Sequence, residues 1–131
     1  MTKFNNHQLS FFIGRLALGM NFMFHGIARL GQVEKFAQGV AKGFQETFFP
    51  ESLAYAYGLF IPYFELVLGF SIALGLFTRS SLFVAGIFMT SLIIGMCLQQ
   101  QWGTVGTQMI YIIVIFLLLK SAEHDTWYLK K

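Results

Sequence analysis

The chain has 131 residues, of which 56% are hydrophobic and only 11% carry a charged side chain. Its mean hydropathy of +0.62 is too apolar for a soluble domain of this length to hide from water. The net charge of +3 comes from basic residues scattered near the ends of apolar runs, without the basic stripe that binds nucleic acid. The composition therefore predicts a membrane protein with the lipid bilayer as a partner, and argues against nucleic-acid binding.

Four apolar runs are long enough to cross a bilayer, because a spanning helix needs about 20 mostly apolar residues. They cover residues 9–28, 53–77, 82–98 and 102–119. We expect an all-α fold, a bundle of four transmembrane helices that forms a single domain over residues 1–131. The first run is expected to be a retained helix, since no small-residue cleavage pattern of a signal peptide follows it.

Four spans place both termini on the same side of the membrane. Lysine and arginine are more frequent at the ends of the runs on that side than at the opposite ends. The positive-inside rule then predicts cytoplasmic termini in a multi-pass protein of the bacterial inner membrane.

The first run contains Arg15 and His25, and Arg29 follows at its end. A charge near the bilayer centre costs at least about 2.5 to 3.5 kcal/mol on insertion scales, so such residues usually face the interior of a bundle. Arg15 can instead extend its long stem toward the inner headgroups. His25 can bond a backbone carbonyl or Tyr57 rather than a ligand. Both alternatives remain open at this point.

The connection between the first and second spans is the longest, and its segment EKFAQGVAKGFQETFFPE has apolar residues at intervals of four. Phe36, Val40, Phe44 and Phe48 share one face, and Pro50 ends the segment. This spacing predicts an amphipathic interfacial helix along the outer membrane surface. Such a helix either serves only as a connection or forms a lid over a site.

Glu65 lies in the middle of the second span. At 1.5 Å per residue, Arg15 lies about 9 Å from the inner edge and Glu65 about 18 Å from the outer edge of a core of about 30 Å. The two depths differ by only about 3 Å, which predicts a buried ion pair between Arg15 and Glu65. The pair can be purely structural, or Glu65 can handle protons. The link that follows, from Thr78 to Ser81, is expected to be a tight hairpin.

A second polar layer is expected closer to the outer surface. By the same count, His25, Tyr57 and Gln108 lie about 24, 24 and 21 Å above the inner edge. With Arg29 at the rim, they form the predicted ligand-binding set of His25, Arg29, Tyr57 and Gln108.

Cysteine and histidine usage limits the redox chemistry of the chain itself. Cys97 is its single cysteine, so the sequence contains no intrachain disulfide, CxxC motif or thiolate metal cluster. A bis-histidine haem is not expected, because only His25 lies within a span while His7 and His124 lie in polar ends. No metal site is predicted and no catalytic residue can be named, so a redox role would need a cofactor or a partner.

Two stretches, RLALGMNFMFHGIARL and ELVLGFSIALGLFTR, resemble the DoxX-like family of small four-helix membrane proteins. The matching positions of the first stretch are Arg15, Gly19, His25, Gly26, Arg29 and Leu30. Those of the second are Glu65, Gly69, Gly75, Leu76, Thr78 and Arg79. The resemblance covers about the first two thirds of the chain. The chain departs from the family at Arg29, where lysine is common, and at its end, where KSAEHDTWYLKK replaces a Ser-Leu-Asp tail.

Relatives in this family are associated with a membrane thiosulfate:quinone oxidoreductase, with oxidative-stress complexes, or with no known activity. The resemblance implies a redox-linked subunit that binds a quinone-like or other small amphipathic ligand between its helices. His25 would then donate a hydrogen bond to the ligand and titrate near neutral pH, while a partner supplies electrons.

Two other functions remain open from the sequence. One is a non-catalytic scaffold or assembly subunit, whose outer helix or C-terminal end docks a partner. The other is a small-solute carrier, which would need to oligomerise to form a path. We therefore expect a protein partner subunit or a homo-oligomer, and whether the chain catalyses a reaction is left open.

Overall fold

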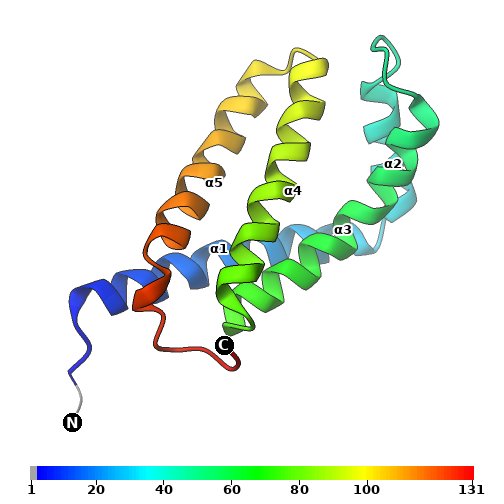
Figure 1. The fold of residues 1–131 in the computed structure, drawn as a ribbon. Coiled ribbons are helices and arrows are strands. Elements are labelled where there is room, and N and C mark those ends of the chain that lie inside the picture. The colour runs from blue at the N-terminus through cyan, green and yellow to red at the C-terminus, as the bar shows by residue number, and fades with distance from the viewer. Residues whose placement is uncertain (1–2) are drawn as a thin grey trace.

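The computed structural model describes residues 3–131, which form five α-helices and a short 3-10 helix (Figure 1). These are α1 (Asn6–Leu30), α2 (Val33–Gly43), α3 (Glu51–Leu74), α4 (Thr78–Leu98), α5 (Trp102–Lys120) and η1 (Ala122–His124). The helices α1, α3, α4 and α5 are each long and apolar enough to cross a membrane. The predicted all-α fold with four candidate membrane spans is therefore confirmed.

The first span begins earlier than its hydropathy indicates, because a capping box fixes its start. The Asn5 side chain accepts a hydrogen bond of 2.9 Å from the Gln8 backbone nitrogen, and the Gln8 side chain accepts one of 3.1 Å from the Asn5 backbone nitrogen. These bonds satisfy backbone donors that the first turn of a helix leaves free. Polar residues ahead of Leu9 are thus part of α1.

The turn between α3 and α4 lies earlier in the chain than predicted. Gly75 takes a left-handed conformation with φ of 70° and ends α3, and the Leu76 nitrogen donates to the Ser71 carbonyl oxygen at 2.8 Å. Phe77 also has a positive φ, of 46°. The turn therefore comprises residues 75–77, and the predicted hairpin from Thr78 to Ser81 is instead the first turn of α4.

Glycines bring α1 and α3 into close antiparallel contact and fix their register. A Cβ on Gly19 would overlap the backbone of Ala73, and a Cβ on Gly69 would overlap that of Met23. A Cβ on Gly26 would lie only 2.7 Å from the Pro62 carbonyl oxygen. Small residues permit such approach in membranes, where packing replaces the hydrophobic drive between helices.

The helix α2 is shorter than the predicted amphipathic segment, since it ends at Gly43 and not before Pro50. It packs against α3 where Ala37, which is fully buried, meets Gly58. A helix in this connection is thus present, and its position along the outer membrane surface stays a prediction.

The helices form two groups that meet at one end of the molecule. In one group α1 and α2 pack against α3, and in the other α4 packs against α5. The buried residues of α4 lie between Thr78 and Met89, in its first half, while those of α5 are Ile115 and Leu118, near its end. The groups therefore share a core beside the turn of residues 75–77, and α4 and α5 diverge from α3 beyond it (Figure 1).

The chain beyond α5, residues 121–131, folds back onto the α3–α4 turn, and we call it the C-terminal tail. The Phe77 nitrogen donates to the Lys130 carbonyl oxygen at 2.7 Å, and the Lys130 nitrogen donates to that of Gly75 at 3.2 Å. Trp127 packs against Phe4 and Phe12, with ring centroids 4.9 and 5.2 Å apart. The tail therefore closes the end of the bundle at which α1 begins (Figure 1).

Candidate functional site

A cavity of about 590 Å³ lies between the two helix groups. All five helices contribute to its wall, which is mainly apolar; one such residue from each helix is Phe22, Val40, Ile61, Leu92 and Tyr111. The cavity exists because α4 beyond Met89 and α5 before Ile115 have no buried residues, so these parts of the two helices pack little against α3. Its size and apolar wall are typical of a site for a small organic molecule.

The structure brings the four predicted ligand-binding residues together on this wall. His25 and Arg29 come from α1, Tyr57 from α3 and Gln108 from α5. They lie together because each is near the end of its helix that faces away from the α3–α4 turn, and their role in binding a ligand stays a prediction.

The ends of α2 and α4 are in contact beside the cavity. The ring of Phe44, which is buried, lies over Gly95, where a Cβ would be 3.1 Å from its Cζ atom. The side chain of Gln99 lies against Gly43 in the same way, with its Cδ 3.0 Å from a Cβ placed there. Phe36, Val40 and Phe44, one face of the predicted amphipathic segment, all line the cavity, whereas Phe48 is 86% exposed. Part of α2 therefore borders the cavity, and both alternatives left open by the sequence, a connection and a lid, stay predictions.

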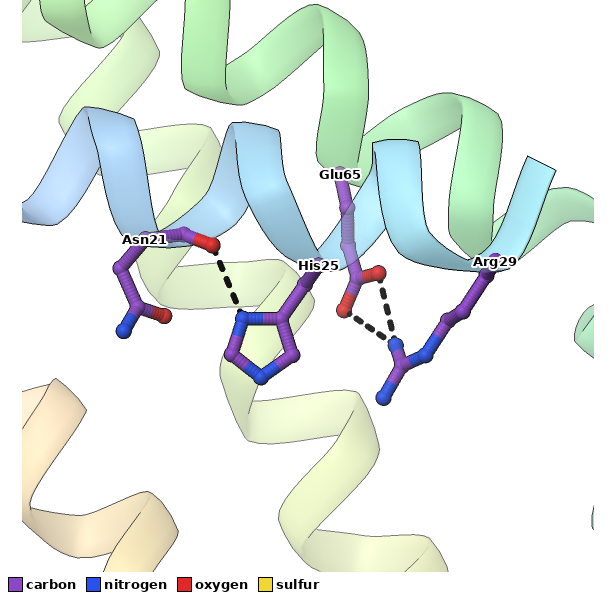
Figure 2. A network of polar contacts seen from close by, with 4 residues as sticks. All are labelled: Asn21, His25, Arg29 and Glu65. Atoms are coloured by element: carbon purple, nitrogen blue, oxygen red, sulfur yellow. Dashed lines mark hydrogen bonds and ion pairs between the residues drawn. The ribbon is translucent and has the colours of Figure 1, made fainter.

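Glu65 pairs with Arg29 at the wall of the cavity (Figure 2). The Arg29 Nη1 atom donates to both carboxylate oxygens, at 2.7 and 2.8 Å. The Arg29 guanidinium also lies over the Phe36 ring, 4.3 Å from its centroid. Glu65 itself is 5% exposed, so the ion pair neutralises a carboxylate buried among apolar side chains.

Arg15 pairs with Asp125 of the C-terminal tail, at 2.8 Å, and the predicted pair of Arg15 and Glu65 is therefore wrong. The physical reason is the register of α1 and α3. The contact of Gly19 with Ala73 places Arg15 beside Gly75, at the end of α3 and far along the helix from Glu65. Hydropathy edges set span depths only coarsely and do not reveal this glycine-determined register.

His25 is exposed to the cavity side of α1 and bonds its own helix (Figure 2). Its Nδ1 atom lies 2.8 Å from the Asn21 carbonyl oxygen. Of the two bonds considered from the sequence, to a backbone carbonyl or to Tyr57, the structure has the first.

Tyr57 bonds a residue that the sequence analysis did not select. Its hydroxyl group is hydrogen-bonded to the Ser91 hydroxyl on α4, and the Ser91 Oγ atom donates to the Phe88 carbonyl oxygen at 2.6 Å. Ser91 also lines the cavity. Its only sequence signal is the small-residue spacing with Gly95, which is equally typical of helix packing.

Gln108 lines the cavity and has a buried side-chain oxygen. Its Oε1 atom is inaccessible to solvent and has no hydrogen-bond partner within residues 3–131. Most buried polar atoms in proteins are paired, so this unpaired acceptor is unusual. Over the same range of residues, no group of three or more His, Cys, Asp or Glu side chains is placed to hold a metal ion.

Comparison with protein families gives a match to the DoxX family over residues 10–98. The chain belongs to the DoxX family. The matched segment of this DoxX protein contains Arg15, His25, Arg29, Tyr57 and Glu65, whereas Gln108 and Asp125 lie beyond it. Comparisons with curated proteins and with solved structures give no match.

Proposed function

We propose that this DoxX-family protein binds a small amphipathic, quinone-like molecule in the cavity between its two helix groups. The observation that carries the proposal is the convergence of His25, Arg29, Tyr57 and Gln108 on one mainly apolar cavity. An apolar wall holds a ring or a short chain, while a few placed polar groups orient it.

The residues present fit such a molecule in volume and in polarity. A cavity of about 590 Å³ lies within the roughly 300 to 1,000 Å³ that small-molecule sites occupy. The unpaired Gln108 Oε1 atom supplies a position at which a ligand gains a hydrogen bond. Because the cavity lies between candidate membrane spans, a lipid-soluble molecule reaches it from the bilayer.

The proposed role is that of a redox-linked membrane subunit. A quinone-like ligand takes up or releases protons when its redox state changes, and His25 is the side chain at the cavity that is suited to exchange them. A partner subunit exchanges the electrons. Membership of the DoxX family supports the membrane location. The chemical identity of a bound ligand tests the redox link.

We place the protein in a bacterial inner membrane with both termini in the cytoplasm. The C-terminal tail and the start of α4 lie at one end of the bundle and carry Lys130, Lys131 and Arg79. This distribution agrees with the excess of basic residues found on the cytoplasmic side of membrane proteins.

The proposal is tested by purifying the protein in a mild detergent and identifying co-purified small molecules by mass spectrometry. Wild type is expected to retain a redox-active amphipathic molecule near one equivalent per chain. The His25→Ala variant should retain much less while keeping its helical circular dichroism spectrum. The control is His124→Ala, which removes a histidine of the C-terminal tail and should leave retention unchanged.

A folded wild-type protein that carries no small molecule would contradict the proposal. If such a protein instead co-purifies in a fixed ratio with another subunit, the scaffold function takes its place. A bound molecule without redox activity would support the site and contradict the redox link.

A further inference from the structure

Two polar side chains on the cavity wall, Tyr57 and His25, give their hydrogen atoms to neighbouring groups of the protein. This follows because each hydrogen bond needs one donor and one acceptor. The remaining donors and acceptors indicate which kind of ligand can bind in the cavity. This inference rests on the proposed function of the same site.

The hydroxyl group of Tyr57 donates its hydrogen to Ser91. The Ser91 hydroxyl has a single hydrogen, which it gives to the Phe88 carbonyl oxygen at 2.6 Å, since a carbonyl can only accept. In the bond between Tyr57 and Ser91, the tyrosine is therefore the donor. The phenolic oxygen keeps its lone pairs, so toward the cavity it can act only as an acceptor.

The hydrogen on the His25 ring is likewise donated within the protein. Its Nδ1 atom faces the Asn21 carbonyl oxygen at 2.8 Å, so Nδ1 carries the hydrogen (Figure 2). In the neutral ring the hydrogen on Nδ1 leaves a lone pair on Nε2. Within the described residues 3–131, the bond of Nδ1 to Asn21 is the hydrogen bond found for this ring.

Gln108 also lines the cavity, and its Oε1 atom is buried without a hydrogen-bond partner within residues 3–131. Its amide NH₂ group can also donate, so the group that suits Gln108 is one that donates and accepts at once. A hydroxyl group does both. A ketone or an ether oxygen only accepts, and would leave Oε1 without a partner.

The charges at the cavity also constrain the ligand. Arg29 and Glu65 pair with each other at 2.7 Å, so the cation and the anion on the wall compensate one another. A charged ligand would have to be desolvated among apolar side chains without a free counter-ion, which is costly. The site therefore suits a neutral molecule.

The geometry points to a ligand that is a neutral, hydroxyl-bearing amphiphile of the phenol or hydroquinone class, held by donation to the acceptors of Tyr57, His25 and Gln108. A ligand hydroxyl group can donate to the Tyr57 oxygen or the His25 Nε2 atom, and it can accept from the N–H groups of Arg29 that Glu65 does not use. We call this preference for a ligand that donates to Tyr57 and His25 the donor rule.

Two probes that differ only in the donor test this inference. The first is 4-nonylphenol, and the second is 4-nonylanisole, in which a methyl group replaces the hydroxyl hydrogen and the apolar chain is the same. Their dissociation constants for the purified wild-type protein are measured by isothermal titration calorimetry in one detergent, with correction for partition into micelles. The phenol is expected to bind about tenfold more tightly or better, since the ether leaves buried acceptors unpaired.

Two matched glutamine variants test whether Gln108 causes the difference in affinity between the two probes. Gln108→Met keeps the length of the side chain and removes the acceptor, and it should shrink the difference between the phenol and the anisole severalfold. Gln101→Met makes the same change at an exposed residue outside the cavity and should leave the difference unchanged. Tyr57→Phe, which removes the phenolic acceptor, should also shrink the difference.

The possible results separate this inference from the proposed function. Equal affinities for the two probes in wild type, or tighter binding of the anisole, would overturn the donor rule and leave a ligand-binding cavity in place. Binding of neither probe by the folded protein would overturn the donor rule and the proposed function together. The comparison in wild type stands even if a variant fails to fold.

Discussion

Arg15 in the first membrane-spanning helix and Asp125 in the C-terminal tail lie 110 residues apart and form an ion pair of 2.8 Å inside the bundle. Their side chains are only 2% and 10% exposed. The tail therefore supplies the counter-ion of a cation that lies within a candidate membrane span. It also carries backbone bonds to Leu74, Gly75 and Phe77, so it is an integral part of the fold.

Loss of Asp125 is expected to destabilise the bundle strongly. The Asp125→Ala variant leaves Arg15 buried without a partner, and the free energy of unfolding should fall by about 3 kcal/mol or more. The measurement is reversible unfolding in mixed micelles with increasing SDS. Glu123→Ala is the control, because the Glu123 side chain is 77% exposed and its removal should change stability by less than about 0.5 kcal/mol. Equal effects of the two changes would mean that the tail does not hold Arg15.

Double-mutant cycles test which arginine pairs with Glu65. Arg29→Ala and Glu65→Ala together should cost less than the sum of their separate effects, with a coupling of about 1 to 3 kcal/mol. The same cycle between Arg15 and Glu65 should be additive within about 0.5 kcal/mol, because these side chains have different partners. Coupling of Glu65 to Arg15 in place of Arg29 would contradict the register described for α1 and α3.

That register is tested directly at Gly26. In Gly26→Ala the new Cβ would lie 2.7 Å from the Pro62 carbonyl oxygen, so α1 and α3 must move apart, at a cost of about 1 to 3 kcal/mol. Gly39→Ala is the matched control, because a Cβ at Gly39 in α2 meets nothing within 4 Å. An alanine there should leave stability unchanged or raise it by roughly 0.5 to 1 kcal/mol. A tolerated alanine at Gly26 would show that the two helices do not touch at this point.

Of the two alternatives for α2, a connection and a lid, the lid predicts faster ligand exchange when Phe44 is removed. Phe44→Ala withdraws the ring that lies over Gly95, and the dissociation rate of 4-nonylphenol should rise roughly tenfold. Stopped-flow displacement with excess unlabelled probe measures that rate. The control Phe48→Ala deletes a ring that is 86% exposed and should leave the rate unchanged. Equal rates in wild type and Phe44→Ala would mean that molecules enter and leave by another route.

The four spans could be predicted from the sequence because each is a long apolar run, and hydropathy responds to exactly that property of the chain in lipid. The ends of the helices were harder to predict from the sequence. The start of α1 depends on the capping bonds of Asn5 and Gln8, and the end of α3 depends on the left-handed backbone of Gly75. Both are local effects that extend or shorten a helix independently of its hydropathy.

The polar residues of the site could be found because polar side chains are conspicuous in apolar spans, as Gln108 is in α5. Which of these residues form ion pairs could not be predicted from the sequence. Arg15, Arg29 and Glu65 were all recognised, but which of the cations reaches the carboxylate depends on the contact of Gly19 with Ala73. The counter-ion of Arg15 lies in a polar tail that the hydropathy pattern does not place. Ser91 was missed because a serine in an apolar helix is equally typical of packing.

The most direct test of the account is a cryo-electron microscopy map of the full chain in lipid nanodiscs, bound to an antibody fragment and purified without added ligand. The account predicts density of a small non-protein molecule between the helix groups, within hydrogen-bond distance of the Gln108 Oε1 and His25 Nε2 atoms. A map in which α4 packs against α2 and α3 along its whole length, with Gln108 paired to a protein group and no cavity, would contradict it.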